Sequence, residues 1–449
     1  MKTTKISDIY NNREELSKLE QIKIGGWVKS VRQNKFIELN DGSSLENLQI
    51  VFSPDLTEKL KRVNFGSELI VSGKLILTPK RAQSCELHAQ EIESITPTSE
   101  GYPLQKKKIP LEVVRDFPHL RAKTNYFLTL FRLRHSISKA IHDFFHQEGF
   151  YYLSTPIITS NDTEGAGELF NIATHEKEPF FSRPAKLTVS GQLQAEALTQ
   201  GLGKVYTFGP CFRAEKSHTT RHLAEFWMVE LEIAFTNLDE ITDLAKKLIK
   251  YVINYVLDNN SPELNYLENY DKENKKEIIS KLKRITGWEF KKIDYNEVIR
   301  ILEKNKKNFT FSNIKWGMDL QSEHEKYLCQ YFGGFPIFVI NYPIELKAFY
   351  MKNNPNGKTV ACFDLLFPRV GEMMGGSMRE DNYQVLIEKA QKIGLDTSNL
   401  NWYFDLRKYG YAPSGGFGLG LERLIMFISD IENIRDTIAF PRFPGKLEF

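Results

Sequence analysis

Short runs of alternating apolar and polar residues in the first hundred positions predict a group of β-strands. Turn residues, such as those at 40–43 and 78–79, separate the runs from one another. The predicted strands cover 22–31, 36–39, 48–52, 68–77 and 86–92. Short strands in such close succession predict a small barrel.

The apolar residues take up helical spacing further along the chain. Leu130, Leu133, Ile137, Ile141 and Phe144 recur three or four positions apart, and Gly149 marks the end of this predicted helix. A strand leading to Pro156 follows. Further helices are predicted over 238–257, 278–285, 295–302 and near 418–429. The change of pattern predicts a domain over 1–103, a linker with three lysines over 104–125 and a second domain over 126–449.

The composition is that of an ordinary globular protein, since 41% of the 449 residues are hydrophobic and 26% are charged. This balance excludes three classes of protein: disordered tail proteins, fibrous repeat proteins and small disulfide scaffolds. The longest apolar run, at 335–340, is far shorter than the ~20 residues that cross a bilayer. No signal segment is expected, and the four cysteines form no Cys-x-x-Cys pair. We therefore expect a cytoplasmic protein without a membrane span or cysteine-bound zinc.

The net charge of +3 does not decide whether the partner is a nucleic acid. Residues 1–110 hold 17 Lys and Arg against 14 Asp and Glu, so the whole excess lies in the first part of the chain. A nucleic-acid partner is compatible with this charge but is not required by it.

Familiar nucleotide and hydrolase motifs do not occur in the sequence. The segment 357–359 lacks the first glycine of a P-loop, because position 352 is lysine. The glycines at 416–420 have the wrong spacing for a dinucleotide-binding turn. There is also no His-Glu-x-x-His pair and no Gly-x-Ser-x-Gly elbow.

Polar residues stand in otherwise apolar, strand-like surroundings at 208–232. Two strands joined by a polar loop would place Arg213, Glu215, Glu225 and Glu230 on connected surfaces. A surface hairpin with weak ion pairs is the alternative. The apolar run that precedes Arg213 favours a buried site.

Two further segments carry candidate chemistry. In 362–380, Asp364 and Glu372 can face one another across a turn. Paired carboxylates suit Mg²⁺ that arrives with nucleotide phosphates, whereas two unrelated surface acids are the alternative. In 415–427, a glycine-rich strand runs into a helix whose first turn holds Arg423, which can meet a phosphate or a planar base.

Together these segments resemble the signature motifs of the class II aminoacyl-tRNA synthetases. The helix and strand ending at Pro156 are similar to motif 1, 212–232 to motif 2 and 418–423 to motif 3. The small barrel is similar to that of subclass IIb, the aspartate, asparagine and lysine enzymes. Ala195 stands where the aspartate enzymes carry a lysine, which leaves room for a neutral amide. Within the subclass, the chain resembles the asparaginyl-tRNA synthetase family in the strings at 165–170, 190–196, 221–228, 371–379 and 433–436.

This resemblance implies an α+β fold, with an N-terminal OB-fold barrel for the anticodon and a class II catalytic domain whose antiparallel sheet is flanked by helices. It implies activation of L-asparagine with ATP to asparaginyl-adenylate, release of pyrophosphate, and transfer to the 3′ end of tRNA(Asn). A homodimer with the motif 1 helix at its interface is expected. The alternatives are an aspartate enzyme of relaxed specificity, a non-catalytic tRNA-binding paralogue, and a tRNA-free asparagine synthetase, which would lack the barrel.

The resemblance also implies roles for individual residues, with Arg213, Arg423 and Glu372 as the catalytic ones. For ATP it implies Arg213 on the α-phosphate, Arg423 on the far phosphates, Glu215, His222, Leu223 and Phe226 at adenine, Gly420 beside the nucleotide, and Asp364 and Glu372 on Mg²⁺. For asparagine it implies Glu164, Ser190 and Gln192 at the α-amino group, Arg379 at the side-chain carbonyl and Glu225 at the side-chain nitrogen. For the anticodon it implies Phe36 as a stacking residue, with a core position as the alternative, and Arg32 and Gln49 at base edges.

Overall fold

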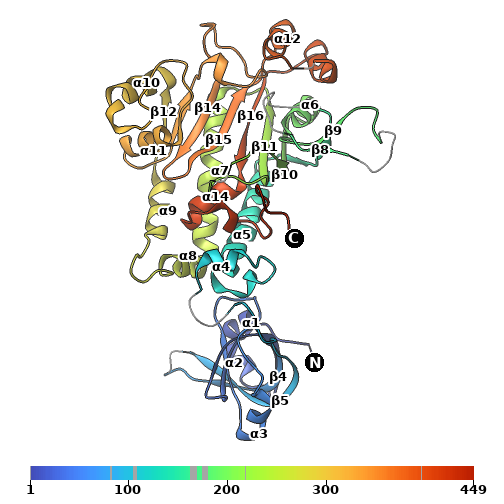
Figure 1. Cartoon of the computed structure of the whole chain (residues 1–449), viewed down its shortest axis with the longest axis vertical. Helices are drawn as coiled ribbons and strands as arrows, with labels where there is room; N and C mark the ends of the chain where they lie inside the picture. The colour runs from blue at the N-terminus through green and yellow to red at the C-terminus, as the bar shows by residue number, and fades with distance from the viewer. Residues whose placement is uncertain are drawn as a thin grey trace. The chain divides into compact units, whose positions relative to one another are not determined.

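The computed structural model (Figure 1) describes residues 2–80, 83–104, 109–161, 169–173, 180–217, 219–395 and 397–448. The chain forms two compact units, Met1–Arg132 and Leu133–Phe449. The predicted linker over 104–125 falls within the first unit, and its three lysines lie outside the described residues. The domain boundaries drawn from the sequence therefore remain predictions.

A closed five-stranded barrel is the centre of the first unit, in the order β1, β2, β3, β5, β4. Its strands are β1 (Ile22–Arg32), β2 (Phe36–Asn40), β3 (Leu48–Val51), β4 (Glu68–Leu77) and β5 (Cys85–Thr96). Neighbours are antiparallel except β3 and β5. The alternation along β1 points Ile22, Ile24 and Val28 into the core, where each is at most 2% exposed. The barrel predicted from the sequence is confirmed.

Short helices accompany the barrel. They are α1 (Ile6–Asn11), α2 (Arg13–Leu16), α3 (Pro54–Thr57) and α4 (Leu111–Arg115), with 3₁₀ turns η1 (Glu58–Leu60) and η2 (Arg121–Lys123). Ile6 and Ile9 of α1 are fully buried in the barrel core. This first helix therefore contributes to the stability of the barrel.

An eight-stranded sheet forms the centre of the second unit, in the order β12, β13, β14, β15, β16, β11, β10, β6 (Figure 1). Its strands are β6 (Tyr151–Leu153), β10 (Lys204–Phe212), β11 (Glu225–Ala234), β12 (Lys291–Asp294), β13 (Ile337–Ile340), β14 (Cys362–Phe367), β15 (Gly371–Met378) and β16 (Ser414–Gly420). Neighbours are antiparallel except the two outermost pairs. A small second sheet contains β7 (Ile158–Thr159), β9 (Ala185–Leu187) and β8 (Asn171–Ile172). The mainly antiparallel sheet of the predicted fold class is confirmed.

Helices flank this sheet. They are α5 (Asn125–Gln147), α6 (Gln192–Leu202), α7 (Leu238–Asn259), α8 (Ser261–Glu268), α9 (Ile278–Gly287), α10 (Tyr295–Lys304), α11 (Ser322–Tyr331), α12 (Tyr383–Lys392), α13 (Asn401–Asp405) and α14 (Leu421–Ser429). The 3₁₀ turns are η3 (Lys306–Asn308), η4 (Ile344–Leu346), η5 (Thr397–Asn399), η6 (Leu406–Lys408) and η7 (Ile434–Asp436). The helix predicted near 418–429 begins only at Leu421, because β16 continues to Gly420 and pairs there with β11.

The apolar stripe of α5 belongs to the core of the chain itself. Leu133, Ile137 and Ile141 are fully buried, and the helix is followed by Gly149 with a φ of +76°. The prediction of a helix that ends at this glycine is confirmed. The stripe carries no evidence for a contact with a second copy, because this chain already covers it.

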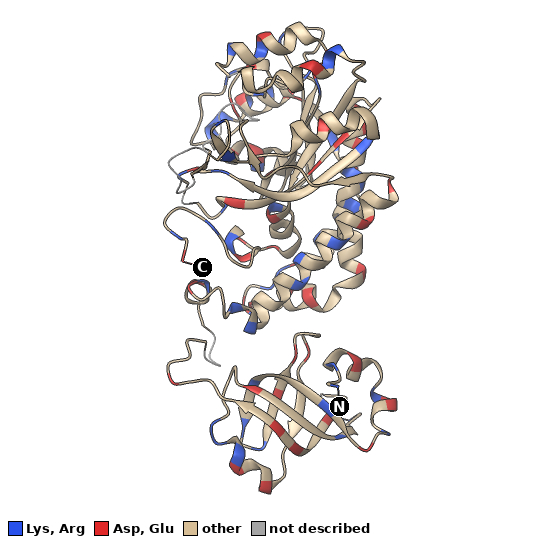
Figure 2. Cartoon of the chain, turned by 90° about the vertical axis from the view of Figure 1, so that its right-hand side faces the viewer, with Lys and Arg blue, Asp and Glu red and all other residues tan. Residues whose placement is uncertain are grey.

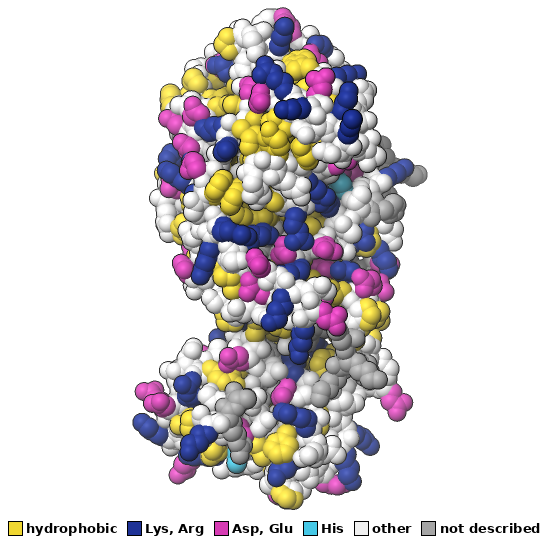
Figure 3. Space-filling model, turned by 90° about the vertical axis from the view of Figure 1, so that its left-hand side faces the viewer, with side chains coloured by type: hydrophobic (Ala, Val, Ile, Leu, Met, Phe, Trp, Pro, Cys, Tyr) yellow, Lys and Arg dark blue, Asp and Glu magenta, His cyan; other side chains and the backbone are white. Residues whose placement is uncertain are grey.

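Charged side chains of both signs are spread over both units. Figure 2 shows lysine, arginine, aspartate and glutamate on the helices and on the barrel strands, and Figure 3 shows the two signs intermixed on one face. This distribution agrees with the small net charge of +3. Among the helices that the structure describes, none combines the length and apolar character that a membrane span requires.

Candidate active site

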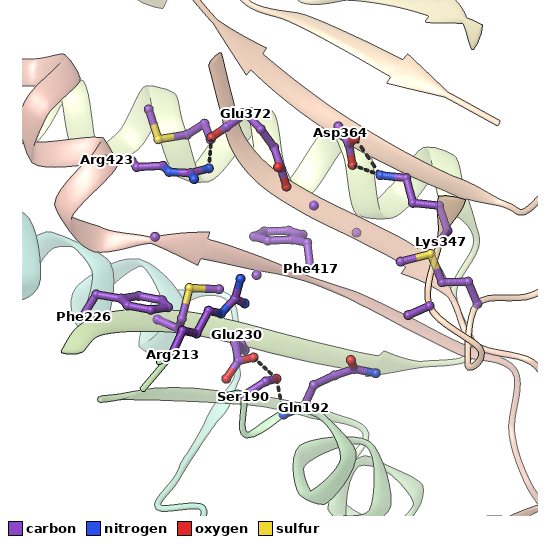
Figure 4. Close-up of a pocket in the computed structure, with 18 of the residues that line it drawn as sticks. Ser190, Gln192, Arg213, Phe226, Glu230, Lys347, Asp364, Glu372, Phe417 and Arg423 are labelled. Atoms are coloured by element: carbon purple, nitrogen blue, oxygen red, sulfur yellow. Dashed lines mark hydrogen bonds and ion pairs between the residues drawn. The ribbon is translucent and has the colours of Figure 1, made fainter. Parts of the chain in front are cut away.

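A cavity of about 650 Å³ lies on the sheet, and all three of the segments singled out in the sequence contribute to it. Figure 4 shows side chains converging on it from β11, β14, β15, β16 and the first turn of α14. The predicted residues that line it are Ser190, Gln192, Arg213, Glu215, His222, Leu223, Phe226, Asp364, Glu372, Arg379, Gly420 and Arg423. The fold therefore brings together residues that are far apart in the sequence.

The hairpin of β10 and β11 positions Arg213. Its strands pair Phe212 with Glu225, and the Arg213 N–H then donates to the carbonyl of Ala224 at 2.9 Å. The guanidinium of Arg213 lies 5.4 Å from the ring centroid of Phe226. A cation and an aromatic face thus adjoin one another, an arrangement suited to a phosphate next to a planar base.

His222 connects the two sides of the loop between these strands. Its Nδ1 lies 3.0 Å from the Ser217 hydroxyl, and its Nε2 lies 3.8 Å from the Glu215 carboxylate. Leu223 follows and is buried, with 7% exposure. The residues predicted to surround a base are therefore adjacent in the structure.

The carboxylates of Asp364 and Glu372 both lie close to Gly375, on the side where a Cβ atom would project. Asp364 pairs with Gly375 across β14 and β15, and a bulge after Leu365 shifts the register so that Glu372 pairs with Leu366. A Cβ atom on Gly375 would lie 3.1 Å from Oε1 of Glu372 and 3.6 Å from Oδ1 of Asp364. A side chain at 375 would therefore fill the space between the carboxylates, and the space with its two hard oxygen donors fits Mg²⁺.

Lys347 is an ion-pair partner of Asp364. Its Nζ lies 2.7 Å from both carboxylate oxygens of Asp364. Burial raises the pKa of Asp364, and Lys347 opposes this shift. Burial by itself lowers the pKa of Lys347, but the interactions with Asp364, Cys362 and Glu372 together outweigh it and keep this pKa above its ordinary value. The cavity therefore contains an ammonium group at this end that is held by both oxygens of Asp364.

Glu325 of α11 adds a carboxylate at the edge of the same site. It accepts a hydrogen bond from the backbone N–H of Glu372 at 3.3 Å. Burial, together with the charges of Glu372 and Asp364, raises the pKa of Glu325 to about 7. Within the described residues, no group of three or more His, Cys, Asp or Glu side chains could hold a metal ion. The two carboxylates beside Gly375 match a metal that arrives with phosphates.

Arg423 reaches the cavity from the first turn of α14, directly after β16. Its guanidinium donates to the backbone carbonyl of Glu372 at 2.6 Å. This bond links the helix to β15 and holds a positive charge next to the carboxylate pair. Figure 4 shows that Arg423 and Arg213 face the same cavity from different elements, so an extended anion can contact both.

Glu230 binds the residues that directly precede α6. Its carboxylate accepts hydrogen bonds from the Ser190 hydroxyl and from the Gly191 N–H, the latter at 2.8 Å. The Ser190 oxygen in turn accepts from the N–H of Gln192 at 3.1 Å. Burial raises the pKa of Glu230, and these hydrogen bonds oppose the shift. Glu230 lines the cavity with Ser190 and Gln192 and fixes their positions.

A buried ion pair lies at the same end of the cavity. Arg379 donates through Nε to both Glu232 oxygens, at 3.1 and 3.2 Å, and through a terminal nitrogen to one of them. Burial raises the pKa of Glu232, and Arg379 opposes this shift. Glu196 nearby is paired with Arg407 and accepts hydrogen bonds from two tyrosine hydroxyls. The charge of each arginine is therefore balanced by a carboxylate.

Glu225 does not reach the cavity, which corrects the prediction made for it. Side chains alternate along a strand, and Phe226, Met228 and Glu230 are the residues of β11 that line the cavity. Glu225 is out of phase with them and belongs to the opposite face. Glu230 takes its place as the acidic residue of this strand at the site. Glu164, also predicted at the site, lies outside the described residues.

Arg32, Phe36 and Gln49 gather on the outer face of the barrel. Phe36 pairs with Arg32 on one side and with Val51 on the other, and it is half-buried. The described core of the barrel does not contain Phe36, which removes the alternative of a core position. Arg32 donates to the amide oxygen of Gln49 at 3.1 Å. The three residues predicted to contact a nucleic acid therefore share one surface.

Sequence reasoning does not find Lys347, Glu232 or Glu196. Lys347 follows η4 and belongs to none of the three segments, so no sequence signal predicts its contact with Asp364. Glu232 carries a signal, because it is two positions after Glu230 and therefore on the same face of β11. A second acid at this spacing in an apolar strand predicts a buried partner for an arginine.

Two family models match the chain. Residues 111–444 match the tRNA synthetases class II (D, K and N), and residues 22–95 match the OB-fold nucleic acid binding domain. The first match covers the cavity, and the second covers the barrel. One family model thus matches the eight-stranded sheet with its cavity, and the other matches the five-stranded barrel.

Several known proteins are similar to the chain over its whole length. An asparagine–tRNA ligase from Mycoplasma mycoides subsp. mycoides is 47% identical, covering 96% of this chain and 97% of its own length. One from Mycoplasmopsis pulmonis is also 47% identical and covers 99% of each. A crystal structure of asparaginyl-tRNA synthetase from Pyrococcus horikoshii, complexed with asparaginyl-adenylate, superposes with a TM-score of 0.89 at 32% identity. It covers 100% of this chain and 99% of that one.

Proposed function

The chain belongs to the asparagine–tRNA ligase family of the class II tRNA synthetases, and on this premise we propose that the cavity on its sheet is the active site. The enzyme activates L-asparagine with ATP and then transfers the asparaginyl group to the 3′ end of tRNA(Asn). One observation carries the assignment of the site: Arg213, Asp364, Glu372 and Arg423 line a single cavity. A paralogue that has lost catalysis would not need these four charged residues in one cavity, so their presence together argues against that alternative.

In the first step, a carboxylate oxygen of asparagine attacks the α-phosphorus of ATP, and pyrophosphate leaves. No covalent bond to the protein forms, so the rate depends on positioning and on stabilisation of charge. Arg213 binds the α-phosphate, and Phe226, whose ring adjoins the guanidinium, stacks on adenine. Glu215 and the backbone at His222 and Leu223 contact the edge of the base.

The far phosphates of ATP lie at the other side of the cavity. Arg423 binds them, because its bond to the carbonyl of Glu372 holds its charge in place. Gly420 adds no side chain here, where a Cβ atom would lie 3.9 Å from the side chain of Arg423. Asp364 and Glu372 would hold Mg²⁺, which supplies positive charge against the phosphates when it is bound. Lys347 pairs with Asp364, so its ammonium group lies at the same carboxylate that would hold the metal.

The amino-acid end of the cavity favours a neutral side chain. Ser190 and Gln192 contact the α-amino group of asparagine, and Glu230 holds both of them in position. Arg379 donates to the side-chain carbonyl, but its charge is already balanced by Glu232. A substrate carboxylate would therefore meet no uncompensated cation, so aspartate binds poorly although its shape is nearly the same.

Ala195 supports the same specificity from a buried position in α6. Its side chain is fully buried and carries no charge, where the aspartate enzymes have a lysine. A lysine there would add the cation that a substrate carboxylate needs. The alanine leaves the balance between the arginines and the buried carboxylates undisturbed.

In the second step, the terminal ribose hydroxyl of tRNA attacks the carbonyl of the adenylate, and AMP leaves. The outer face of the barrel binds the anticodon of the same tRNA, with Phe36 stacking on a base and Arg32 and Gln49 bonding to base edges. Phe36→Ala should slow charging of tRNA while ATP–pyrophosphate exchange continues. An equal loss in both assays would indicate a folding defect and would remove this support.

A homodimer is supported by exposed apolar residues at and after the edge strand β6. Tyr151 and Tyr152 are 59% and 51% exposed, and Ile157 and Ile158 are 44% and 47% exposed. A second copy would cover this patch, and sedimentation should give twice the chain mass of 52.0 kDa. A cytoplasmic location follows from the reaction, since tRNA is charged where translation uses it.

The assignment of the site is tested by ATP–pyrophosphate exchange in the presence of asparagine. Arg423→Met should lower the exchange rate by about a hundredfold or more, since it removes a charge that stabilises the transition state. Arg300→Met is the matched control, because Arg300 is an exposed arginine of α10 that pairs with Glu297 on the same helix. Equal rates for the two variants would contradict the proposal.

A further inference from the structure

Three basic side chains converge on Asp430, the residue that follows α14. Arg369 donates from a terminal nitrogen to one carboxylate oxygen of Asp430 at 2.6 Å, and Lys281 donates to the same oxygen at 2.9 Å. Lys276 donates to the backbone carbonyl of Asp430 and lies 3.7 Å from its other carboxylate oxygen. We call Lys276, Lys281 and Arg369 the basic cluster. Its members come from the turn between β14 and β15 and from the region of α9.

The basic cluster holds more positive charge than Asp430 and Glu432 offset. Asp430 balances one of the three charges, and Glu432, 4.0 Å from Arg369, balances a second. Positive charge is also in excess along the chain here, since 272–284 holds six Lys and Arg against two Asp and Glu. Burial lowers the pKa of Lys281, and the charges of the other two cluster members lower it further, against the opposing effect of Asp430. An anion that binds here would relieve this repulsion.

Arg369 extends from a turn whose backbone favours glycine. Its side chain is 57% exposed, and that of Lys276 is 36% exposed. The φ of Arg369 is +69°, in the left-handed region that residues with a side chain disfavour. The turn itself therefore does not explain an arginine at 369. Because a guanidinium carries five N–H groups in a planar fork, it can bind Asp430 and a phosphate oxygen at the same time.

The basic cluster lies beside the cavity. Arg221, which lines the cavity, donates to the backbone carbonyl of Arg369 at 2.6 Å. Helix α14 provides a second link, since its first turn carries Arg423 at the cavity and its last turn leads to Asp430. The helical rise between these two residues is about 10 Å. A molecule whose end enters the cavity can therefore contact the cluster with the part that remains outside.

We propose that the basic cluster binds the phosphate backbone of the tRNA acceptor stem, the base-paired segment next to the 3′ end. The 3′ end must enter the cavity to receive the asparaginyl group, so the acceptor stem lies at the rim of the cavity. Lys and Arg side chains bind phosphates without regard to base sequence. The cluster thus contributes affinity for the stem and fixes its orientation. The proposal rests on the proposed function and adds a contact surface to it.

The test compares charging of tRNA(Asn) with ATP–pyrophosphate exchange on one preparation of each variant. Arg369→Gly removes the side chain at a position where the backbone favours glycine, and Arg369→Glu reverses the charge. The kcat/KM for tRNA, divided by the exchange rate, should fall by about fivefold in Arg369→Gly and by about tenfold or more in Arg369→Glu. A loss of folded enzyme cancels in this ratio. Arg300→Glu makes the same reversal at a side chain of α10 that is 75% exposed, and should keep the wild-type ratio.

Binding of RNA fragments to the full chain shows which part of the tRNA contacts the cluster. The Kd for an acceptor-stem minihelix should rise in Arg369→Gly, and its slope against salt on logarithmic axes should become shallower by about 1. The Kd for an anticodon stem-loop should stay at the wild-type value.

The possible outcomes separate this proposal from the proposed function. If the wild type charges tRNA(Asn) and the Arg369 variants keep its ratio of charging to exchange, the proposal is wrong while the proposed function stands. An unchanged Kd for the minihelix, or an equal rise for both fragments, would also overturn it. If the wild type does not charge tRNA(Asn), the proposed function is itself wrong, and this proposal fails with it.

Discussion

The ammonium group of Lys347 lies 2.7 Å from both carboxylate oxygens of Asp364. The acid proposed to bind Mg²⁺ is thus already neutralised by a residue of the chain. A divalent ion that binds Asp364 must compete with this ammonium. The pair therefore makes the site weak for a free metal ion and better suited to one that arrives with the charge of ATP.

Replacement of Lys347 by methionine should strengthen binding of a free divalent ion. Without the ammonium, Asp364 and Glu372 present uncompensated charge, so Mn²⁺ affinity in the absence of ATP should rise by about tenfold. Electron paramagnetic resonance of Mn²⁺ measures this directly. Lys352→Met, which removes a lysine paired with Asp381 at 2.6 Å, is the control and should leave the affinity as it is. An unchanged affinity in Lys347→Met would show that the two cations do not compete.

Glu230 and Glu225 provide a matched pair of variants on one strand. Glu230→Gln disturbs the carboxylate that holds Ser190 and Gly191, so kcat/KM for asparagine should fall by about ten- to a hundredfold in the exchange assay. Glu225→Gln removes an equal charge from the opposite face and should stay within about twofold of the wild type. A larger loss in Glu225→Gln than in Glu230→Gln would overturn the placement of these two acids.

Glu325 makes the stability of the empty enzyme depend on pH. Its pKa is raised to about 7, above the ordinary value of 4.5, so its contribution is complete below pH 4.5 and is lost as the pH rises through 7. Glu325→Gln avoids this loss. Relative to the wild type, the variant should gain stability between pH 5 and pH 8, on the order of 2 kcal/mol, in thermal unfolding without metal or ATP.

Glu323 on the same helix is the control for this pH experiment. Backbone hydrogen bonds from Phe311 and Thr310 lower its pKa, so it stays ionised throughout the window from pH 5 to pH 8. Glu323→Gln should therefore differ from the wild type by the same amount at both pH values. A pH-independent difference for Glu325→Gln as well would show that burial does not raise its pKa.

The ion pair of Glu232 with Arg379 bears on the choice between asparagine and aspartate. Glu232→Gln removes the carboxylate that bonds to Arg379, and the next carboxylate, Glu196 at 4.0 Å, is already paired with Arg407. A substrate carboxylate therefore gains an attractive partner. The ratio of kcat/KM for asparagine to that for aspartate should fall by about tenfold or more. Measuring both amino acids with one preparation removes the effect of the expected loss of stability. A ratio equal to that of the wild type would show that charge balance at Arg379 does not set specificity.

Much of the fold could be predicted because its signals are local. The barrel strands show alternation, and the stripe of α5 and the glycine after it mark a helix and its end. The limits of β16 were harder to predict. Its glycines give no alternation of side chains, so the helix that follows was expected three residues too early, whereas pairing with β11 extends the strand to Gly420.

The candidate site was predicted less completely, and the errors have a physical cause. Glu225 and Glu230 are both acidic residues of β11. They differ only in the face of the strand on which they lie, and the sequence does not show which face is turned to the cavity. Lys347 reaches Asp364 through a tertiary contact that no sequence spacing encodes.

The central claim is that this enzyme activates asparagine and discriminates against aspartate by a charge-balanced pocket. ATP–pyrophosphate exchange by the wild-type chain, measured with each amino acid in turn, tests it most directly. We predict a kcat/KM for asparagine at least about a thousandfold above that for aspartate, as expected when mismatched buried polar groups are left unpaired. Exchange that is equally fast with aspartate, or that occurs with aspartate alone, would contradict the account.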